Sequence, residues 1–338
     1  MPPFSKKEAE KLALEYFGIH ATASPLPSYA DLNFLLKTKS GKKYVLKIYK
    51  PGEEKEQLEA QNEMLLHLEK HLPQLTFPRI IKNKNGENTT LLKSKKNGQR
   101  LLRLLTWVEG RMLVNVNPHS PRLLKNLGQS IGHLCNGLRG FDHPAAHRYF
   151  EWDTAQAAWT ERFFHFIKNK EKRALAEHFY GLSIKNALPK LPALRHSVLH
   201  NDANDFNVLV NADPENPAVS GIIDFGDIVH SATVNELAIA IAYAVQRKND
   251  PLTAAAQIVA GTHEIFPLEE QELELLYHLI AARLLISLTS AAINISKNPG
   301  NEYLKVSQQP GWDLLEKWKA VPAALAHFTF RQACGFEA

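Results

Sequence analysis

The sequence has few cysteines and no long apolar run, and these two absences exclude several classes of protein. Its two cysteines, Cys135 and Cys334, are far apart and match no metal-ligand spacing, so neither a disulfide scaffold nor a zinc site is expected. No stretch reaches the roughly 18 apolar residues of a membrane-spanning helix, because the nearest candidate, residues 275–295, contains His278 and Arg283. The N-terminus also has no apolar run of signal-peptide length. These features predict a protein of the cytoplasm with no membrane segment.

Basic residues outnumber acidic ones, which raises the question of an anionic partner. The formal net charge is +5, and a nucleic-acid-binding protein usually gathers such charge on one face with aromatic residues among it. The main lysine cluster, residues 82–98, instead reads as a hairpin with turns at Asn85-Gly86 and Asn97-Gly98, whose alternating charges form a solvated face. We therefore expect no nucleic-acid partner, and a mildly basic surface suits an anionic nucleotide.

The chain changes character near residue 109. Before it, short alternating strands surround one helix over residues 53–71, which predicts a compact strand-rich lobe. After it, apolar spacing predicts helices over residues 120–140 and 152–182, and the last hundred residues are helical again. The expected fold class is α+β, with an N-terminal lobe of residues 1–108 and a C-terminal lobe of residues 109–338.

Three polar residues stand beside two short apolar strands in the second lobe. Asn207 follows Asp202 by five positions and leads into the strand 208–210, while Asp224 ends the strand 221–223. A strand–turn–strand arrangement would bring the three side chains to one site. Asn and Asp are also common in ordinary turns, but the spacing H-x-D-x4-N followed by I-I-D-F-G-D favours a functional group.

The chemistry of phosphoryl transfer explains why these residue types would be wanted together. The reaction needs a carboxylate that orients the attacking hydroxyl and receives its proton, and oxygen ligands that hold Mg²⁺ on the phosphates. Asp202 suits the first task. Asn207 and Asp224 suit the second, because magnesium takes few protein oxygens and completes its shell with phosphate and water.

These motifs resemble the catalytic and metal-binding loops of the aminoglycoside phosphotransferase family. That family is similar in fold to protein kinases and includes choline, homoserine and hydroxylysine kinases. The resemblance implies a protein kinase-like two-lobe fold with a small antiparallel sheet in the N-lobe and a mostly helical C-lobe. It also implies that Asp202 is the catalytic base, that Asn207 and Asp224 hold magnesium, and that His200 braces the catalytic loop.

The N-terminal lobe should supply the rest of a nucleotide site. Lys47 interrupts an alternating strand, 44–49, and could reach the α- and β-phosphates as the strand lysine does in kinases. The following helix should present an acidic partner, but its buried face carries Gln61 where a glutamate is expected. Either Gln61 holds Lys47 by a hydrogen bond, or the helix is rotated and Glu63 does so.

The segment that would cover the phosphates contains no glycine between Pro25 and Phe34. Backbone N–H groups of a tight turn can still bind phosphate, with Ser28 and Asn33 as side-chain donors. A plain turn into a strand is the alternative. This loop is similar to that of hydroxylysine kinases and of the kinase-like N-terminal domain of certain fused class III aminotransferases.

Segments 103–110, 148–153 and 301–312 extend that narrower likeness over most of the chain. By this resemblance, main-chain groups of the hinge (Leu105, Trp107 and Val108) would meet the purine. Trp152 and Asp153 would face the acceptor, since an aromatic wall and a carboxylate suit a cationic amine. An aromatic anchor and a helix N-cap are the alternative roles. Arg283, in an apolar helix, would bind an acceptor carboxylate or pair with a buried acid.

The predicted activity is transfer of the γ-phosphate of magnesium-bound ATP or GTP to a hydroxyl of a small amino alcohol or hydroxy amino acid. Hydroxylysine-like, homoserine-like and choline-like acceptors are favoured over aminoglycosides. A nucleotide-binding protein without transfer activity is the alternative that the missing glycines and Gln61 leave open. The acceptor, the choice between ATP and GTP, and the oligomeric state do not follow from these motifs.

Overall fold

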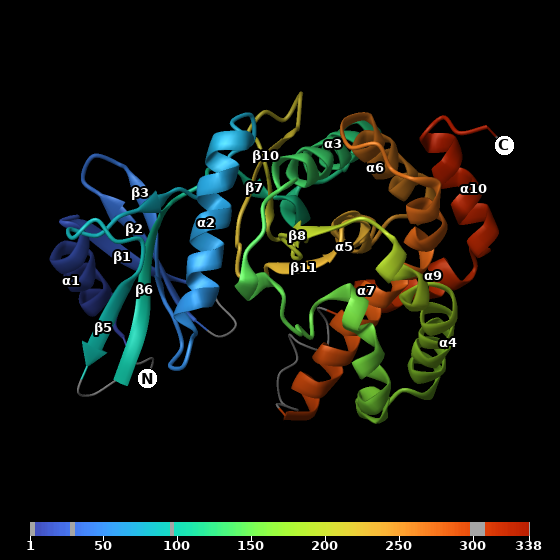
Figure 1. Ribbon diagram of the computed structural model, residues 1–338, viewed down its shortest axis with the longest axis horizontal. Coiled ribbons are helices and arrows are strands. Elements are labelled where there is room, and N and C mark those ends of the chain that lie inside the picture. Colours follow the sequence, from blue (N-terminus) through green and yellow to red (C-terminus); the bar gives the residue numbers. More distant parts are fainter. Residues whose placement is uncertain (1–3, 28–30, 95–97, 298–307, 338) are drawn as a thin grey trace. The chain divides into compact units, whose positions relative to one another are not determined.

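The computed structural model describes residues 4–27, 31–94, 98–297 and 308–337. The chain separates into two compact units, Met1–Glu109 and Gly110–Ala338 (Figure 1). The first unit is built on an antiparallel sheet and the second mainly on helices. This composition confirms the predicted α+β class.

All the strands of the first unit belong to one sheet. Its order is β1-β2-β3-β6-β4, and β5 also pairs with β6. Every pair is antiparallel. Within residues 82–98, where the sequence predicts a hairpin, the structure has strand β5, which pairs with the following strand β6 so that Ser94 lies opposite Gly98. The predicted turn at Asn97-Gly98 lies partly outside the described residues. The strands are β1 (Ala21–Leu26), β2 (Leu32–Thr38), β3 (Lys43–Ile48), β4 (Ile80–Ile81), β5 (Thr90–Ser94) and β6 (Gly98–Thr106).

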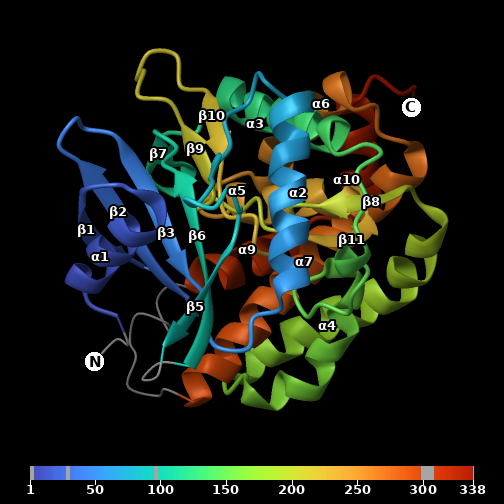
Figure 2. The same ribbon diagram turned by 60° about the vertical axis from the view of Figure 1, so that its left-hand side comes forward.

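One helix covers each face of this sheet. α1 (Lys6–Phe17) lies against one side of the sheet (Figure 2). Its buried alanines share a core with Leu102 and Leu104 of β6. α2 (Lys55–His71) contributes Leu58 to a cluster with Leu101 of the same strand. Because successive strand residues point to opposite faces, α1 and α2 lie on opposite faces. The odd-numbered residues of β6 therefore face α2.

Two small sheets carry the polar loops of the second unit. The order of the first is β10-β9-β7, and the second pairs β11 with β8. Short 3-10 helices lie between these strands and the larger helices. The strands are β7 (Arg111–Met112), β8 (His196–Leu199), β9 (Val208–Val210), β10 (Val219–Ile222) and β11 (Val229–Ala232), and the 3-10 helices are η1 (Leu113–Asn115), η2 (Pro144–Ala146), η3 (Thr154–Phe166) and η4 (Leu188–Ala193).

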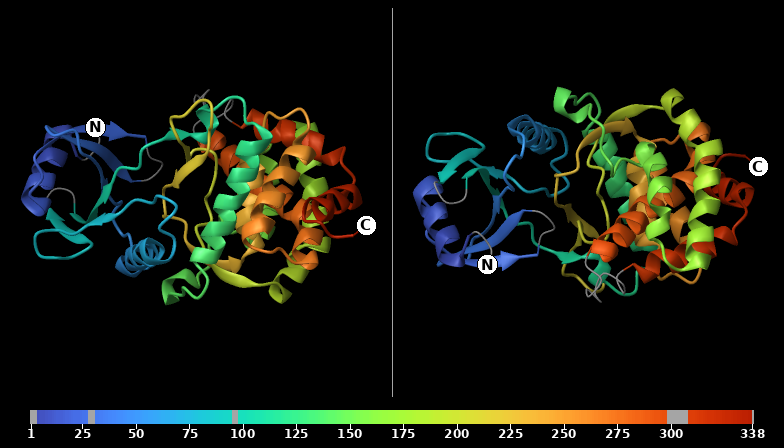
Figure 3. Two further views of the ribbon diagram at one scale, coloured as in Figure 1. Left: turned by 90° about the horizontal axis from the view of Figure 1, so that it is seen from above. Right: turned by 90° about the horizontal axis from the view of Figure 1, so that it is seen from below.

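Helices make up most of the second unit (Figure 3). α3 and α6 run side by side at close range, because Gly128 of α3 and Gly261 of α6 each lie against the backbone of the other helix. A Cβ at Gly128 would lie 1.9 Å from the carbonyl oxygen of Ile258. The helices are α3 (Pro121–Gly137), α4 (Lys170–Asn186), α5 (Val234–Ala244), α6 (Pro251–Ile265), α7 (Glu270–Lys297), α9 (Gln309–Lys319) and α10 (Ala323–Ala333).

The helix expected over residues 152–182 is two helices. η3 ends at Phe166 and α4 begins at Lys170. Asn169 starts the second helix, since its Oδ1 accepts a hydrogen bond from the backbone N–H of Lys172 (2.8 Å). The apolar spacing continues past Asn169, so the sequence pattern does not show that one helix ends and another begins there.

α7 is the described helix that is long and apolar enough to cross a membrane by length and composition. Most of its side chains are buried inside the second unit, where Leu276, Ile280 and Leu284 belong to the main hydrophobic core. A buried core helix, as predicted for this segment, satisfies the same criteria. Arg283 is 1% exposed within it.

Candidate active site

The β9–β10 hairpin brings the two polar motifs of the second unit together. Ile222 lies opposite Val208, and the backbone N–H of Ile223 donates to the carbonyl oxygen of Asn207 (2.9 Å). Asn207 enters β9 at the same end of the hairpin at which Asp224 leaves β10. The pairing of two short apolar strands therefore places residues 207 and 224 side by side.

Asp202 lies at the centre of this group and three side chains hold its carboxylate. Asn207 Nδ2 donates to Oδ2 (2.7 Å) and also to the main-chain carbonyl of Asp202 (3.0 Å). Asn204 Nδ2 donates to Oδ1 (2.9 Å), and Arg283 Nη2 donates to the same oxygen (3.0 Å). The carboxylate is thus fixed in one orientation, as a group that must receive a proton from a bound hydroxyl requires.

Asn204 also shapes the loop that carries Asp202. Its Oδ1 accepts from the backbone N–H groups of Phe206 (2.8 Å) and Asn207 (3.1 Å). This side-chain-to-backbone turn returns the chain toward Asp202 before β9 begins. The sequence motifs alone assign Asn204 no role, although an Asn two positions after Asp202 is a turn signal.

Two non-glycine residues at the site adopt left-handed backbone conformations. Asn201 has φ 64° and Asp224 has φ 65°. Such conformations cost of order 1–3 kcal/mol and persist where surrounding contacts enforce them, often at active sites. Asn201 directly precedes Asp202, and Asp224 is itself the residue predicted to hold the metal.

Glu236 of α5 enforces the conformation at Asn201. Its Oε2 accepts the backbone N–H of Asn201 (3.0 Å), and the side chain is almost completely buried. Burial raises the pKa of Glu236 to about 7. Glu236 belongs to none of the motifs read from the sequence, and the one signal of its role is an acid within the apolar run of residues 234–244.

His200 ties the two motifs together through its ring nitrogens. Nε2 donates to the carbonyl oxygen of Ile223 (3.0 Å), and Nδ1 accepts the backbone N–H of Asp202 (3.2 Å). Burial lowers the pKa of His200 to about 4, which matches an imidazole that is neutral and uses one nitrogen as an acceptor. His200 therefore braces the loop and carries no positive charge at neutral pH.

The electrostatics of Asp202 reflect opposing influences. Burial raises the pKa of its carboxyl above the usual range, and the Arg283 guanidinium opposes this effect. Asp224 and Asp227 add negative charge nearby and raise it further. A divalent cation in this group would offset that repulsion.

The residues present fit a magnesium ion that also binds phosphate. The Asn207 amide nitrogen donates to Asp202, so the Oδ1 atom of Asn207 can serve as a metal ligand. The Asp224 carboxylate is exposed. No group of three or more His, Cys, Asp and Glu side chains among the described residues could hold a metal by itself. A magnesium ion here would take one carboxylate, one amide oxygen and oxygens of the bound phosphates and water.

Of the three predicted acceptor residues, Arg283 contacts Asp202, and Trp152 contacts Arg283. Arg283 donates from Nη1 to the carbonyl oxygen of Trp152 (2.6 Å), and its guanidinium carbon lies 5.3 Å from the centre of the Trp152 ring. Arg283 thus pairs with a buried acid, which is the second of the two roles considered for it. Because that acid is Asp202, this arginine holds the candidate base and is not a free carboxylate receptor.

Asp153 has a different role from the predicted one. It is 3% exposed and caps η3, with Oδ1 accepting from the backbone N–H of Ala155 (3.0 Å) and from Ser231 Oγ (2.7 Å). The acceptor-binding prediction for Asp153 is therefore corrected to the N-cap alternative.

In the first unit, Lys47 stands in a row of polar residues. Asn33 of β2 lies opposite Lys47 of β3, and Lys47 lies opposite Arg103 of β6. Residues directly opposite on antiparallel strands share a face of the sheet. The register thus places Asn33 beside Lys47, while Ser28 lies outside the described residues.

Gln61 lies on the buried face of α2, and Glu63 is exposed. Gln61 Oε1 accepts from Arg103 Nη2 (2.6 Å). The helix thus turns Gln61, and not Glu63, to its buried side, where Gln61 contacts the cross-strand neighbour of Lys47. Sequence analysis gave Arg103 no role in the site.

The predicted hinge is only partly available for a purine. Leu105 is paired with Val45 on one side and Ile80 on the other, so its main chain is occupied by the sheet. The backbone N–H of Trp107 donates to the carbonyl oxygen of Lys43 (3.2 Å). Leu105 is therefore corrected to a strand residue, and Val108, which follows the strand, remains the hinge candidate.

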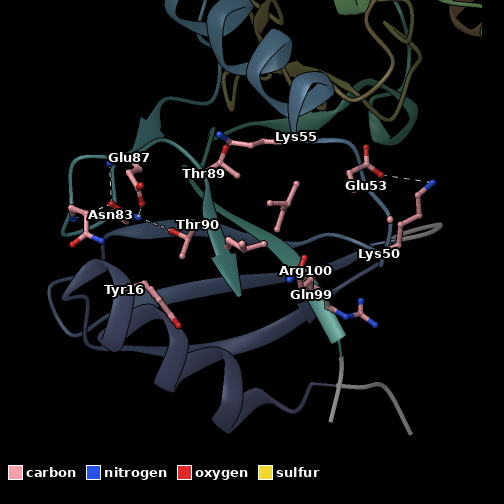
Figure 4. Close-up of a pocket in the computed structure, with 14 residues that line it drawn as sticks. Tyr16, Lys50, Glu53, Lys55, Asn83, Glu87, Thr89, Thr90, Gln99 and Arg100 are labelled. Atoms are coloured by element: carbon pink, nitrogen blue, oxygen red, sulfur yellow. Dashed lines mark hydrogen bonds and ion pairs between the residues drawn. The ribbon is translucent and has the colours of Figure 1, made fainter. Parts of the chain in front are cut away.

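A pocket of about 550 Å³ opens elsewhere in the first unit (Figure 4). Lys50, Glu53, Lys55, Glu87 and Arg100 contribute polar groups to its wall, with both signs of charge. It includes none of the residues to which nucleotide-binding roles were assigned. The pocket is therefore separate from the residues predicted to bind the nucleotide.

Comparisons with known proteins agree with this geometry. A family model described as "Phosphotransferase enzyme family" matches residues 22–275. A hydroxylysine kinase of Mus musculus is 30% identical over 341 residues, covering 94% of this chain and 89% of that protein, and one of Xenopus laevis is 30% identical over 338 residues, covering 93% and 90%. Among solved structures, a microcompartment-associated aminopropanol kinase superposes with TM-score 0.73 at 16% identity, over 92% of this chain and 96% of that one. An amicoumacin kinase in complex with AMP-PNP and Ca²⁺ gives TM-score 0.71 at 13% identity, over 95% of each chain. These likenesses show a kinase-like fold.

Proposed function

The chain belongs to the phosphotransferase enzyme family and is a kinase with a hydroxyl acceptor, and we propose that this acceptor is a small amino alcohol or hydroxy amino acid. Similarity to hydroxylysine kinases over nearly the whole chain supports this class. The fold of an aminopropanol kinase, whose substrate is also an amino alcohol, agrees with it. Aminoglycosides are less favoured because the curated relatives act on a smaller acceptor.

The observation that carries the proposal is the fixed Asp202 carboxylate. Asn204 and Arg283 occupy Oδ1, and Asn207 binds Oδ2 from one side. A substrate hydroxyl that donates to this carboxylate is aligned for attack on the γ-phosphorus. As the new P–O bond forms, the bond from the γ-phosphorus to the β–γ bridging oxygen breaks, and the hydroxyl proton passes to Asp202.

The phosphate donor in this proposal is a magnesium-bound nucleoside triphosphate. Asn207 and Asp224 would hold the magnesium ion, which when bound neutralises charge on the phosphates. Lys47 would contact the α- and β-phosphates, with Asn33 beside it. Either ATP or GTP fits these contacts, because none of them reads the base.

On the acceptor side, Trp152 offers an aromatic face next to Arg283 and Asp202. We place the apolar part of the acceptor against this ring. Asp227, which adds negative charge near Asp202, would favour an acceptor that carries an amine.

An acceptor screen tests the proposal. Hydroxylysine, 1-amino-2-propanol, homoserine, choline and kanamycin are each mixed with ATP or GTP and magnesium, and nucleoside diphosphate release is measured with a coupled assay. We expect release only with one of the small amino alcohols or hydroxy amino acids. Release with kanamycin alone would contradict the acceptor class, and nucleotide binding without release for any acceptor would indicate a protein without transfer activity.

The metal assignment is tested separately with Asp224→Ala. This variant should lose the stabilisation by nucleotide that depends on magnesium, because a ligand stabilises the native state more the more tightly it binds that state. Thermal unfolding with nucleotide, with and without EDTA, measures this difference. An unchanged magnesium effect in Asp224→Ala would place the ion elsewhere.

A further inference from the structure

Two aromatic side chains contact the buried guanidinium of Arg283. Its central carbon lies 5.3 Å from the centre of the Trp152 ring and 5.6 Å from the centre of the Tyr243 ring. Both aromatic residues are half-buried, whereas Arg283 is 1% exposed. Trp152 is one of the predicted acceptor residues, but Tyr243 belongs to none of the motifs read from the sequence.

Tyr243 differs from the rest of its own helix. α5 packs against α7, the helix that carries Arg283 (Figure 1). Of the eleven residues of α5, all of which the structure describes, Tyr243 is the one that is not buried. Tyr243 is therefore the residue through which this apolar helix reaches a polar site.

The same face of α5 also contacts the main chain of the catalytic loop. Glu236 and Tyr243 are seven residues apart, which is about two turns, so they lie on one face of the helix. Glu236 accepts the backbone N–H of Asn201, the residue before Asp202 (3.0 Å). Tyr243 contacts Arg283, which donates to Asp202 Oδ1 (3.0 Å). One face of α5 thus supports both the backbone of this loop and, through an arginine, its carboxylate.

The ring contacts matter because an arginine side chain is long and flexible. Holding it in one rotamer costs conformational entropy. An aromatic ring attracts a cation through its quadrupole, and the attraction is stronger where water is excluded. Because water is excluded from the Arg283 guanidinium, the rings oppose this entropy cost and favour the rotamer that reaches Asp202.

We infer that Tyr243 is a positioning residue for phosphate transfer: its ring holds the guanidinium of Arg283, and Arg283 in turn fixes the carboxylate of Asp202. The inference rests on the proposed function, because it takes Asp202 as the group that receives the hydroxyl proton. Two other roles for Tyr243 predict different results. A tyrosine that only packs α5 on α7 would change stability and not transfer, and one that binds the acceptor directly would change KM.

The variants separate the ring of Tyr243 from its hydroxyl. Tyr243→Leu removes the ring and keeps an apolar side chain, and Tyr243→Met does the same in case the first variant does not fold. Tyr243→Phe keeps the ring and removes the hydroxyl. Tyr180→Leu is the matched control, because it removes another half-buried tyrosine of this unit, from α4, whose hydroxyl donates to the carbonyl oxygen of Ala158 (3.3 Å).

The experiment is a double-mutant cycle on the full-length chain. Each Tyr243 variant is made in the wild type and in Arg283→Met. The acceptor is whichever of hydroxylysine, 1-amino-2-propanol, homoserine, choline and kanamycin the wild type phosphorylates fastest with ATP or GTP and magnesium. The kcat of transfer and KM for this acceptor are measured, and urea unfolding reports stability.

We expect Tyr243→Leu to lower kcat about tenfold while KM stays within about twofold. A tenfold loss corresponds to about 1.4 kcal/mol, which is within the range of a cation–π contact shielded from water. Tyr243→Phe and Tyr180→Leu should keep kcat within about twofold of the wild type. In Arg283→Met, Tyr243→Leu should change kcat by less than about twofold, because the group that the ring holds is already absent.

A tenfold loss that persists in Arg283→Met would overturn the inference, since Tyr243 would then act independently of the arginine. The inference would also fall if kcat were unchanged without the ring, if KM rose at the wild-type kcat, or if Tyr243→Phe lost as much as Tyr243→Leu.

Failure of the proposed function is distinguishable from failure of this inference. If the wild type phosphorylated none of the acceptors, the proposed function would fail, and this inference with it. If the wild type transferred phosphate and Arg283→Met did so at the same rate, the inference alone would fail.

Discussion

Arg283 and Asp202 form an ion pair, with 3.0 Å between Nη2 and Oδ1, although 81 residues separate them in the sequence. Arg283 is 1% exposed and also donates to the carbonyl oxygen of Trp152. One buried side chain therefore joins the candidate base to the segment that precedes η3. This contact couples the segment of Trp152, which we propose to face the acceptor, to the loop of Asp202.

Replacing Arg283 by Met should lower kcat by about a hundredfold, because Asp202 loses the donor that fixes Oδ1 and small displacements of a catalytic group have effects of that size. Steady-state kinetics with the best acceptor measures this loss. Nucleotide affinity should stay within about twofold, and added guanidinium should restore part of the rate.

Arg331→Met serves as the matched control for this prediction, since Arg331 also pairs with a carboxylate, that of Glu270, but at an exposed position. Its kcat should equal that of the wild type. A normal kcat in Arg283→Met would mean that Asn204 and Asn207 orient Asp202 without help.

Glu236 should make stability depend on pH. Burial raises the pKa of Glu236 to about 7 from its ordinary 4.5. Between these values the folded protein keeps a proton that the unfolded chain has lost, so the free energy of unfolding falls as the pH rises. Above about pH 7 both states are ionised and the penalty, of order 3 kcal/mol, is constant.

Glu236→Gln has no proton to lose, and its amide oxygen can still accept the N–H of Asn201. The free energy of unfolding of this variant, relative to the wild type, should therefore rise between pH 5 and pH 7 and then level off. Urea unfolding at several pH values measures the difference. A difference that is flat over this range would show that Glu236 is already ionised at pH 5.

Asp153 should prove to be a stability residue. Asp153→Ala removes the N-cap of η3 and the bond from Ser231, and the expected loss is about 1 kcal/mol in the free energy of unfolding. Asp153→Asn keeps a capping oxygen and should lose less. Neither variant should change KM for the acceptor by more than about twofold; a tenfold rise in Asp153→Asn would restore the acceptor-binding role.

Local pattern was sufficient to predict the β9–β10 hairpin and the residues at its end. The spacing of Asp202, Asn207 and Asp224 is short, and two apolar strands that flank a turn can hardly pair in another way. The buried position of Gln61 also followed from helical periodicity. These features depend on neighbours within a few residues or one hairpin.

The contacts that sequence analysis missed depend on elements far apart in the chain. Arg103 meets Gln61 across 42 residues, and Glu236 meets Asn201 across 35. Periodicity could show that these side chains are buried, but not which partners they meet. Leu105 was misassigned because the alternation of apolar residues predicts a strand but does not show whether other strands pair with both edges of that strand.

The most direct test of the central claim is a comparison of wild type and Asp202→Asn in transfer and in binding. Asparagine keeps the size of the side chain but cannot receive the hydroxyl proton. Single-turnover phosphorylation of the acceptor and calorimetric nucleotide affinity are measured on the same preparations. The account predicts that the variant binds the magnesium nucleotide within about threefold of the wild type and transfers phosphate at least about a hundredfold more slowly. Transfer at the wild-type rate would contradict it.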